Sequence, residues 1–303
     1  MAMLEFLTEN LQSALKNVNV NLVYELRVRA NKPVVVCYGG KYTFLGPFGL
    51  TERRDMALTA SFSDIENIIY RASEFSVYSV TEQLRQGFLT GADGERIGLA
   101  GVFVYENGSA FTVKDVTSLN IRVPHEIYGC AKKICEVCFA GGVKSALLLS
   151  PPGRGKTTML RDIARTLGSA GPVNLLINDE RNEISAAQRD FTLDIGPFAD
   201  VIRYSYKKDA LLAAVRAMRP DAVITDEIVS AEEMSAVTAC VRGGVEVIAS
   251  AHLRDLSALR ESPVFAPALS EKLFSFYIVL SEAEIGRVAG IYAQDLSPVF
   301  IAE

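Results

Sequence analysis

One short loop constrains the fold of this chain more than any other feature. Residues 150–157 read Ser-Pro-Pro-Gly-Arg-Gly-Lys-Thr and lie between an apolar run and a segment of helical periodicity. The spacing matches the phosphate-binding pattern G-x-x-x-x-G-K-[ST], except that Ser150 replaces the first glycine. Such a turn points backbone N–H groups and the positive end of a helix at one anion. The loop therefore predicts a phosphate site after a buried strand, with an ordinary glycine-rich turn as the competing interpretation.

The residues of the loop have separate expected roles. Gly153 and Gly155 allow the backbone to close around phosphate oxygens. Lys156 is expected to reach the β- and γ-phosphates, and Thr157 is expected to bind Mg²⁺ through its hydroxyl. No N-K-x-D element for guanine follows the loop, which favours ATP as the nucleotide. The expected nucleotide contacts are Pro152, Gly153, Arg154, Gly155, Lys156, Thr157 and Thr158.

Two acids, Asp226 and Glu227, end a later apolar run. A Mg²⁺ ion held by Thr157 keeps several waters, and a nearby carboxylate such as Asp226 orders them. Glu227 is expected to activate or position the water that attacks the γ-phosphate. A solvated acidic pair is the alternative for both acids. His252 follows another apolar run and is expected to hydrogen-bond the γ-phosphate, with a structural histidine as an equal competitor.

A second acidic group follows the predicted strand at residues 173–178. Asp179, Glu180 and Glu183 lie directly after it. The carboxyl ends of strands in open α/β sheets face the ligand crevice. These acids are therefore candidates to position water or Mg²⁺. The alternative is a solvated loop with ion pairs through Arg181.

From residue 143 onward, apolar runs alternate with helical segments, which is typical of a parallel sheet covered on both faces. Ser230 and Glu233 predict a capping box. Gly141-Gly142 marks the expected boundary of this α/β domain, residues 141–303. The expected strands are 146–149, 173–178, 200–204, 222–225 and 245–250, and the expected helices are 156–167, 207–218 and 231–242.

Residues 1–140 predict a smaller α+β domain. Apolar spacing predicts a helix over residues 2–16, and Ser63 with Glu66 predicts a capping box at a second helix. Short β-rich runs alternate with turn residues, which predicts an antiparallel sheet. The expected strands are 34–36, 88–89, 96–105 and 110–116, and the expected tight hairpins are at Asp93-Gly94 and Asn107-Gly108.

Charge and hydropathy exclude several classes of protein. The 303 residues carry 31 Lys+Arg and 36 Asp+Glu, a formal net charge of −5, which argues against direct binding of nucleic acid. A secretory signal and an apolar run of membrane-spanning length are both missing, so we expect a cytoplasmic protein without direct membrane insertion. The odd number of cysteines favours reduced thiols. A metal site is the less favoured alternative at His125, Cys130, Cys135 and Cys138.

Several separated motifs resemble the stage III sporulation protein AA family over essentially the whole chain. They lie at residues 25–29 with Lys32-Pro33, and at 82–88, 96–101, 151–162, 179–184 and 224–228. That family is similar to the type II and type IV secretion ATPases. The resemblance implies a RecA-like P-loop domain that forms a ring hexamer and hydrolyses ATP with Mg²⁺. It also implies a role in the mother cell, where membrane-embedded sporulation channel proteins would be the partners.

The resemblance also implies roles for single residues. The acidic box of the secretion ATPases, whose first Glu is thought to be the general base, matches Asp179 and ends at Glu183. Their Mg²⁺-side strand carries a single Glu, which matches Glu227. The base therefore stays open between Glu227 and the pair Asp179 and Glu180. The histidine box matches His252.

The N-terminal domain of the same family lends arginines to the nucleotide of a neighbouring subunit. The matching residues are Arg96 and Arg122, and an arginine supplied in trans raises phosphoryl-transfer rates about 10³–10⁵-fold. An ordinary solvated strand residue is the alternative for each arginine. Two other functions stay open for the chain: a nucleic-acid-dependent ATPase with a RecA-like domain, and a nucleotide-binding assembly scaffold without hydrolysis.

Overall fold

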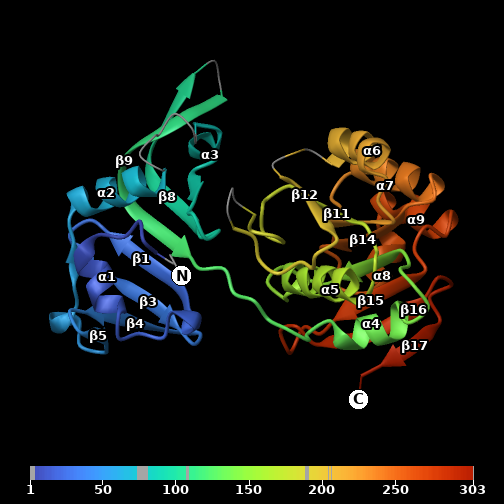
Figure 1. Ribbon diagram of the computed structural model, residues 1–303, viewed down its shortest axis with the longest axis horizontal. Coiled ribbons are helices and arrows are strands. Elements are labelled where there is room, and N and C mark those ends of the chain that lie inside the picture. The colour runs from blue at the N-terminus through green and yellow to red at the C-terminus, as the bar shows by residue number, and fades with distance from the viewer. Residues whose placement is uncertain are drawn as a thin grey trace. The chain divides into compact units, whose positions relative to one another are not determined.

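The computed structural model describes residues 4–73, 81–106, 109–187, 191–203, 205 and 207–302, which form two compact units (Figure 1). The first unit runs to His125 and includes residues 191 and 192, and the rest of the chain forms the second. Helix α4 (Lys132–Cys138) buries Ile134 in the same core as Ala146. The stretch from residue 126 to 140 therefore packs with the second unit, although the Gly-Gly pair predicts a later boundary.

The first unit is built on an antiparallel sheet with the strand order β5-β4-β3-β1-β9-β8-β7. The chain turns at Asp93-Gly94 between β7 and β8, as the sequence predicts, with Gly94 at φ +80°. The pair Asn107-Gly108 lies outside the described residues. The elements are α1 (Glu9–Leu15), β1 (Val23–Arg29), β2 (Lys32–Pro33), β3 (Val35–Tyr38), β4 (Lys41–Gly46), β5 (Gly49–Thr51), β6 (Thr59–Ala60), α2 (Phe62–Ala72), α3 (Thr81–Arg85), β7 (Phe88–Thr90), β8 (Arg96–Glu106) and β9 (Ser109–Arg122).

The first helix is shorter than the apolar spacing predicts. Helix α1 begins at Glu9, with Thr8 as its N-cap residue, and Leu4 lies at φ +69°, outside the helical region. The backbone N–H of Leu4 donates a hydrogen bond of 3.0 Å to the carboxylate of the buried Glu95. This long-range contact keeps the start of the chain out of the helix, because tertiary context overrides local propensity.

Helix α2 begins earlier than expected because a different serine caps it. The N–H of Asp64 donates to Ser61 Oγ at 3.1 Å, and the N–H of Ser61 donates to the Asp64 carboxylate at 2.7 Å. The capping box is therefore Ser61 with Asp64, and the prediction of Ser63 with Glu66 is wrong. Both pairs have the same spacing, but Ser61 has the extended backbone that an N-cap residue needs, with φ −88° and ψ 170°.

The second unit is built on a sheet with the strand order β12-β11-β13-β14-β10-β15-β16-β17. The strands from β12 to β15 are parallel, which confirms the α/β prediction, and β16 and β17 add an antiparallel edge. The elements are β10 (Ala146–Leu149), α5 (Lys156–Ala170), β11 (Leu175–Asp179), β12 (Ala199–Arg203), α6 (Lys207–Met218), β13 (Ala222–Glu227), α7 (Ala231–Arg242), β14 (Glu246–Ala251), α8 (Leu256–Glu261), α9 (Ala266–Ser270), β15 (Phe276–Leu280), β16 (Val288–Ala293) and β17 (Pro298–Ile301).

Alternation along the central strand β10 explains why helices cover both faces of this sheet. Ala146 and Leu148 belong to the core that includes residues of α5, whereas Leu147 and Leu149 belong to the core that includes residues of α6 and α7. Successive side chains of a strand point to opposite faces, so an all-apolar strand needs a cover on each (Figure 1). Among the described residues, no helix combines the length and the apolar character needed to cross a membrane.

The two serines near the start of α2 allow a test of its cap. Ser61→Ala should lower the free energy of unfolding by about 0.5–2 kcal/mol, because it leaves a helix N–H without an acceptor. Ser63→Ala is the matched control and should change it by less than about 0.5 kcal/mol, since its hydroxyl makes only an exposed contact. Urea unfolding of the full chain measures both. Equal losses in the two variants would contradict the assignment of the cap.

Candidate active site

The glycine-rich loop connects β10 to α5 at the carboxyl edge of the parallel sheet. Gly155 is the N-cap residue of α5 at φ +89°, and Gly153 lies at φ +73°. Both values fall in the left-handed region that favours glycine. A Cβ on Gly155 would also lie 3.4 Å from the backbone N of Gly286, whose N–H donates to the Arg154 carbonyl. The loop is therefore a backbone cradle, bordered by the segment that follows β15.

Lys156, the lysine of this loop, is held by the loop itself. Its Nζ donates hydrogen bonds to the carbonyl oxygens of Ser150 and Pro151, both at 3.0 Å. Burial lowers the pKa of Lys156 to about 8, and the charge of Glu227 opposes that shift. Ser150, which replaces the usual first glycine, is fully buried with its hydroxyl directed to the Pro151 carbonyl. A serine is accommodated there because Ser150 has no positive φ.

The carboxyl ends of four parallel strands, β11, β13, β14 and β10, lie side by side in that order. Their last residues include Asp179, Asp226 with Glu227, and Ala251, and Ser150 directly follows β10. The register of β13 against β14 shifts between Ile224 and Glu227. Bulges of this kind re-aim side chains at the ends of strands. The sheet therefore gathers the predicted acids of β11 and β13 at the edge that carries the phosphate loop.

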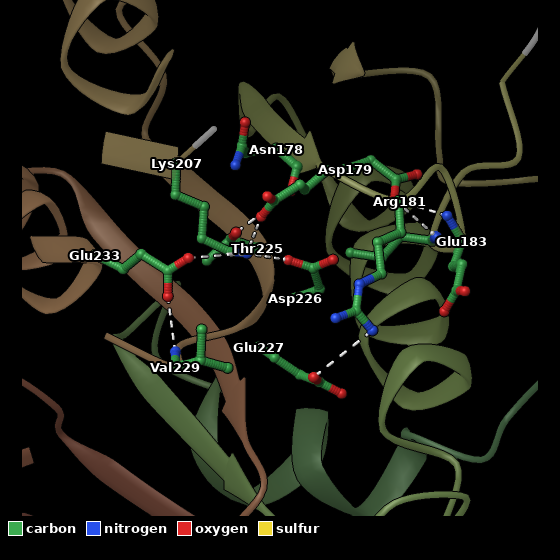
Figure 2. Close-up of polar contacts among 12 residues, drawn as sticks. Asn178, Asp179, Arg181, Glu183, Lys207, Thr225, Asp226, Glu227, Val229 and Glu233 are labelled. Atoms are coloured by element: carbon green, nitrogen blue, oxygen red, sulfur yellow. Dashed lines mark hydrogen bonds and ion pairs between the residues drawn. The ribbon is translucent and has the colours of Figure 1, made fainter. Parts of the chain in front are cut away.

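The carboxylate of Glu227 lies between a histidine and an arginine. One oxygen of this carboxylate contacts His252 Nε2. The other oxygen lies 3.9 Å from the guanidinium of Arg181 (Figure 2). The side chain of Glu227 is 20% exposed, so water reaches it. His252 directly follows β14, and Ser150 directly follows the neighbouring strand β10. The alternative interpretation pairs Arg181 within its own loop, whereas the structure places its guanidinium near Glu227 on the neighbouring strand β13.

Asp179 has a different environment from the other acids. It is fully buried, and its two oxygens accept hydrogen bonds from the N–H groups of Glu183, Ile184 and Ser185 and from the Ser185 hydroxyl, at 2.7–3.2 Å. These bonds fold the acidic segment into a tight loop. Glu183 contributes its backbone to this loop, and its carbonyl accepts from Arg161 at 2.6 Å. The carboxylate of Asp179 therefore acts as the anchor of the loop.

The sequence analysis did not predict two basic residues that contact the acidic segments. Arg161 on α5 joins the phosphate-loop helix to the carbonyls of Glu183 and Ile184. Lys207, the first residue of α6, lies 2.6 Å from Asp226 and 2.7 Å from Glu180. Helix spacing alone gives no sign of either contact. A lysine in the first turn of a helix is nevertheless a local anomaly, because acids are favoured there.

Asp226 is the most strongly perturbed acid of the group. Burial raises the pKa of Asp226 to about 6, while the charge of Lys207 opposes that rise. With Thr157 at the start of α5, this carboxylate provides hard oxygen donors of the kind that Mg²⁺ prefers. The donor set therefore fits a magnesium ion held by Thr157 and the waters that Asp226 orders.

The two predicted arginines lie in the first unit. Arg96 on β8 and Arg122 on β9 are direct cross-strand partners. The Arg96 guanidinium stacks on the Phe88 ring, 4.2 Å from its centroid, and Arg122 is exposed. Directly opposed residues of an antiparallel pair share one face, so the two positive charges lie together.

Asp179→Asn separates an anchoring role from a catalytic one. The variant should lose at least about 2 kcal/mol of unfolding free energy, because an amide cannot accept all four hydrogen bonds and its NH₂ opposes donors. Asp200→Asn, on the exposed position of the neighbouring strand β12, is the matched control and should be close to neutral. Chemical denaturation measures both variants. Native stability in Asp179→Asn would show that the carboxylate does not hold the loop.

Comparison of the sequence with known proteins identifies a family that matches nearly the whole chain. The chain matches the family model described as "Sporulation stage III, protein AA" over residues 2–298. It is 33% identical over 301 residues to Stage III sporulation protein AA of Bacillus subtilis (strain 168), which covers 96% of this chain and 94% of that protein.

Solved structures show the same fold at low sequence identity. The ATPase DotB of Legionella pneumophila aligns with a TM-score of 0.56 and 14% identity, over 88% of this chain and 74% of that one. The pilus retraction motor PilT with bound ADP aligns with a TM-score of 0.56 and 15% identity, over 86% and 75%. The fold is thus that of the secretion and motor ATPases, which confirms the predicted RecA-like architecture. By its match across nearly the whole sequence, the chain belongs to the stage III sporulation protein AA family.

Proposed function

We propose that this chain binds ATP with Mg²⁺ and hydrolyses it to do mechanical work on a partner. The observation that carries the proposal is the meeting of the phosphate loop, Asp226, Glu227 and His252 at one edge of the sheet. The fold shared with the ATPase DotB and with the pilus retraction motor PilT, which was solved with bound ADP, supports it.

The loop residues have the chemistry that triphosphate binding needs. Backbone N–H groups of residues 153–158 and the N-terminus of α5 bind phosphate oxygens. Lys156 exchanges its two carbonyl acceptors for the β- and γ-phosphates, where a negative charge favours its protonated form. Thr157 and Asp226 hold Mg²⁺, which neutralises charge on the phosphates when bound.

We assign the positioning of the attacking water to Glu227. The competing acids are already engaged: Asp179 accepts four hydrogen bonds from its loop, and Glu180 accepts one from Lys207. Glu227 is partly exposed, and its partners are a histidine and a loop arginine. His252 orients Glu227 and is placed to respond when phosphate leaves.

An arginine that acts in trans requires that two chains meet at one nucleotide. We infer a homo-oligomeric ring, a hexamer, in which Arg96 or Arg122 of one subunit stabilises the γ-phosphate bound by its neighbour. Hydrolysis would then shift the two units of each chain. In the sporulating cell, the ring works in the mother-cell cytoplasm and is held at the membrane by a channel protein toward the forespore.

Two substitutions separate nucleotide binding from chemistry. Lys156→Ala should abolish hydrolysis and weaken nucleotide binding, because the charge that faces the phosphates is lost. Glu227→Gln should keep binding but lose at least about 10²-fold in turnover, because an amide cannot accept the proton of the water. Phosphate release and the fluorescence of a labelled nucleotide measure the two properties. Glu232→Gln, an exposed acid in the first turn of α7, is the control.

The same assay distinguishes the alternatives. Full turnover by Lys156→Ala would disprove the site, and full turnover by Glu227→Gln would return the base to Asp179 or Glu180. Nucleotide binding without any turnover by the wild-type chain would favour an assembly scaffold. Stimulation by single-stranded DNA would favour a nucleic-acid-dependent ATPase. Turnover per chain that rises with protein concentration would support an assembled ring.

The arginine role makes its own prediction. Arg96→Ala should bind nucleotide normally and lose about 10³-fold in turnover if its guanidinium acts on the phosphate of a neighbouring subunit. Mixing Arg96→Ala with Lys156→Ala should restore part of the activity, because each variant supplies the half of the site that the other lacks. Arg122→Ala is tested in parallel. Loss of nucleotide binding by Arg96→Ala, or failure of the mixture, would contradict action in trans.

A further inference from the structure

A lysine without a role in the proposed mechanism is buried among the carboxylates of the active-site edge. The side chain of Lys207 is 3% exposed. Its Nζ lies 2.6 Å from Asp226 Oδ1 and 3.9 Å from Glu233 Oε1 (Figure 2). The same Nζ lies 2.7 Å from Glu180 Oε2. Three acids from three segments of the chain thus converge on one ammonium group.

Local structure does not favour a lysine at this position. The first turn of a helix carries partial positive charge, which repels a cation. An ammonium also loses its hydration on burial, at a cost that only paired charges offset. Burial alone lowers the pKa of Lys207, but the charges and hydrogen bonds of Asp226 and Glu180 outweigh it and raise the pKa above its ordinary value. Lys207 therefore stays charged because of the carboxylates around it.

The acids that hold Lys207 are themselves anchored. Glu233 is part of the capping box of α7, where its Oε2 accepts the N–H groups of Val229 at 2.7 Å and Ser230 at 3.2 Å. Asp226 is a residue of β13, and Glu180 follows β11 directly. A strand end, the residue after a strand and a helix cap therefore hold the ammonium from three segments of the chain.

This arrangement changes how the site meets a divalent cation. Closely spaced carboxylate oxygens are the preferred ligands of Mg²⁺ and Mn²⁺. Lys207 already takes Oδ1 of Asp226 and one oxygen of Glu180, and its charge repels a second cation. A metal ion that reaches Asp226 must therefore gain further ligands elsewhere, and the phosphates of a bound nucleotide provide them.

We propose that Lys207 prevents these three carboxylates from binding a divalent cation by themselves, so that the metal enters the site only together with a nucleotide. Lys207 is thereby a positioning residue: it holds Oδ1 of Asp226 and leaves Oδ2 for the water shell of the metal. Entry of the metal together with a nucleotide rests on the proposed function. The block on metal binding by the carboxylates alone concerns the nucleotide-free chain and does not depend on that function.

The test measures Mn²⁺ binding to the full chain without nucleotide, by electron paramagnetic resonance of the free ion. The wild-type chain should show no Mn²⁺ site at this carboxylate. Lys207→Met should gain one Mn²⁺ site, because one buried positive charge is removed. The Kd of this site should be at least about tenfold lower than that of any Mn²⁺ binding by the wild-type chain. Lys207→Arg keeps the charge and should gain nothing. Adding Asp226→Asn to Lys207→Met should abolish the gained site.

Two results would overturn the proposal. The first is Mn²⁺ binding by the wild-type chain alone at a site that Asp226→Asn removes, a measurement that needs no variant at Lys207. The second is equal Mn²⁺ binding by folded Lys207→Met and wild type. A parallel titration with ADP keeps the failures apart. A wild-type chain that binds neither ADP nor Mn²⁺ with ADP would refute the proposed nucleotide site, while the metal-only comparison would still decide the role of Lys207.

Discussion

The parallel sheet of the second unit concentrates carboxylates at one edge, and the site depends on how each of these charges is compensated. Removing an acid from water costs several kcal/mol unless donors replace the water. Asp179 receives backbone N–H groups, Asp226 receives the ammonium of Lys207, and Glu227 receives His252 with Arg181. These partners distinguish the three acids: Asp179 anchors a loop, Asp226 is paired with a cation, and Glu227 stays accessible to water, which is why we propose it as the base.

Two buried lysines at this edge have acceptors of different charge, and their pKa values are shifted in opposite directions. The acceptors of Lys156 Nζ are two carbonyl oxygens at 3.0 Å and the Ser150 hydroxyl at 3.4 Å, all of them neutral, and burial lowers the pKa of Lys156 to about 8. Lys207 has carboxylates at 2.6 and 2.7 Å, and its pKa is raised. A lysine with neutral acceptors gains strongly from an incoming anion, whereas a lysine already paired gains little. In the proposed site, Lys156 is therefore the lysine that meets a phosphate, whereas Lys207 is already paired with carboxylates.

Local patterns predicted the elements whose signals are local, and failed where distant residues decide. The strand over residues 146–149, the helix over 231–242 and the Ser230 capping box follow from periodicity and spacing. The start of α1 does not, because Glu95 captures the Leu4 N–H across the fold. Ser61 with Asp64 and Ser63 with Glu66 have the same spacing, so the sequence alone does not decide which pair caps α2. The four hydrogen bonds of Asp179 and the contacts of Lys207 are made between residues that local spacing does not relate, so only the fold reveals which partners each acid has.

Two arginines of the first unit, Arg96 and Arg122, lie directly opposite each other on neighbouring strands. Like charges directly opposite in a sheet destabilise it by roughly 0.2–1 kcal/mol. Glu25 lies opposite Arg122 on the other side, but its carboxylate is held by Arg27 and Tyr42 at 3.0 Å. Among the described residues, Arg122 forms no ion pair, and Arg96 rests its guanidinium on an aromatic ring. In the proposed ring, a phosphate held by a neighbouring subunit is the anion that these two guanidinium groups bind, because guanidinium groups pair well with phosphate oxygens.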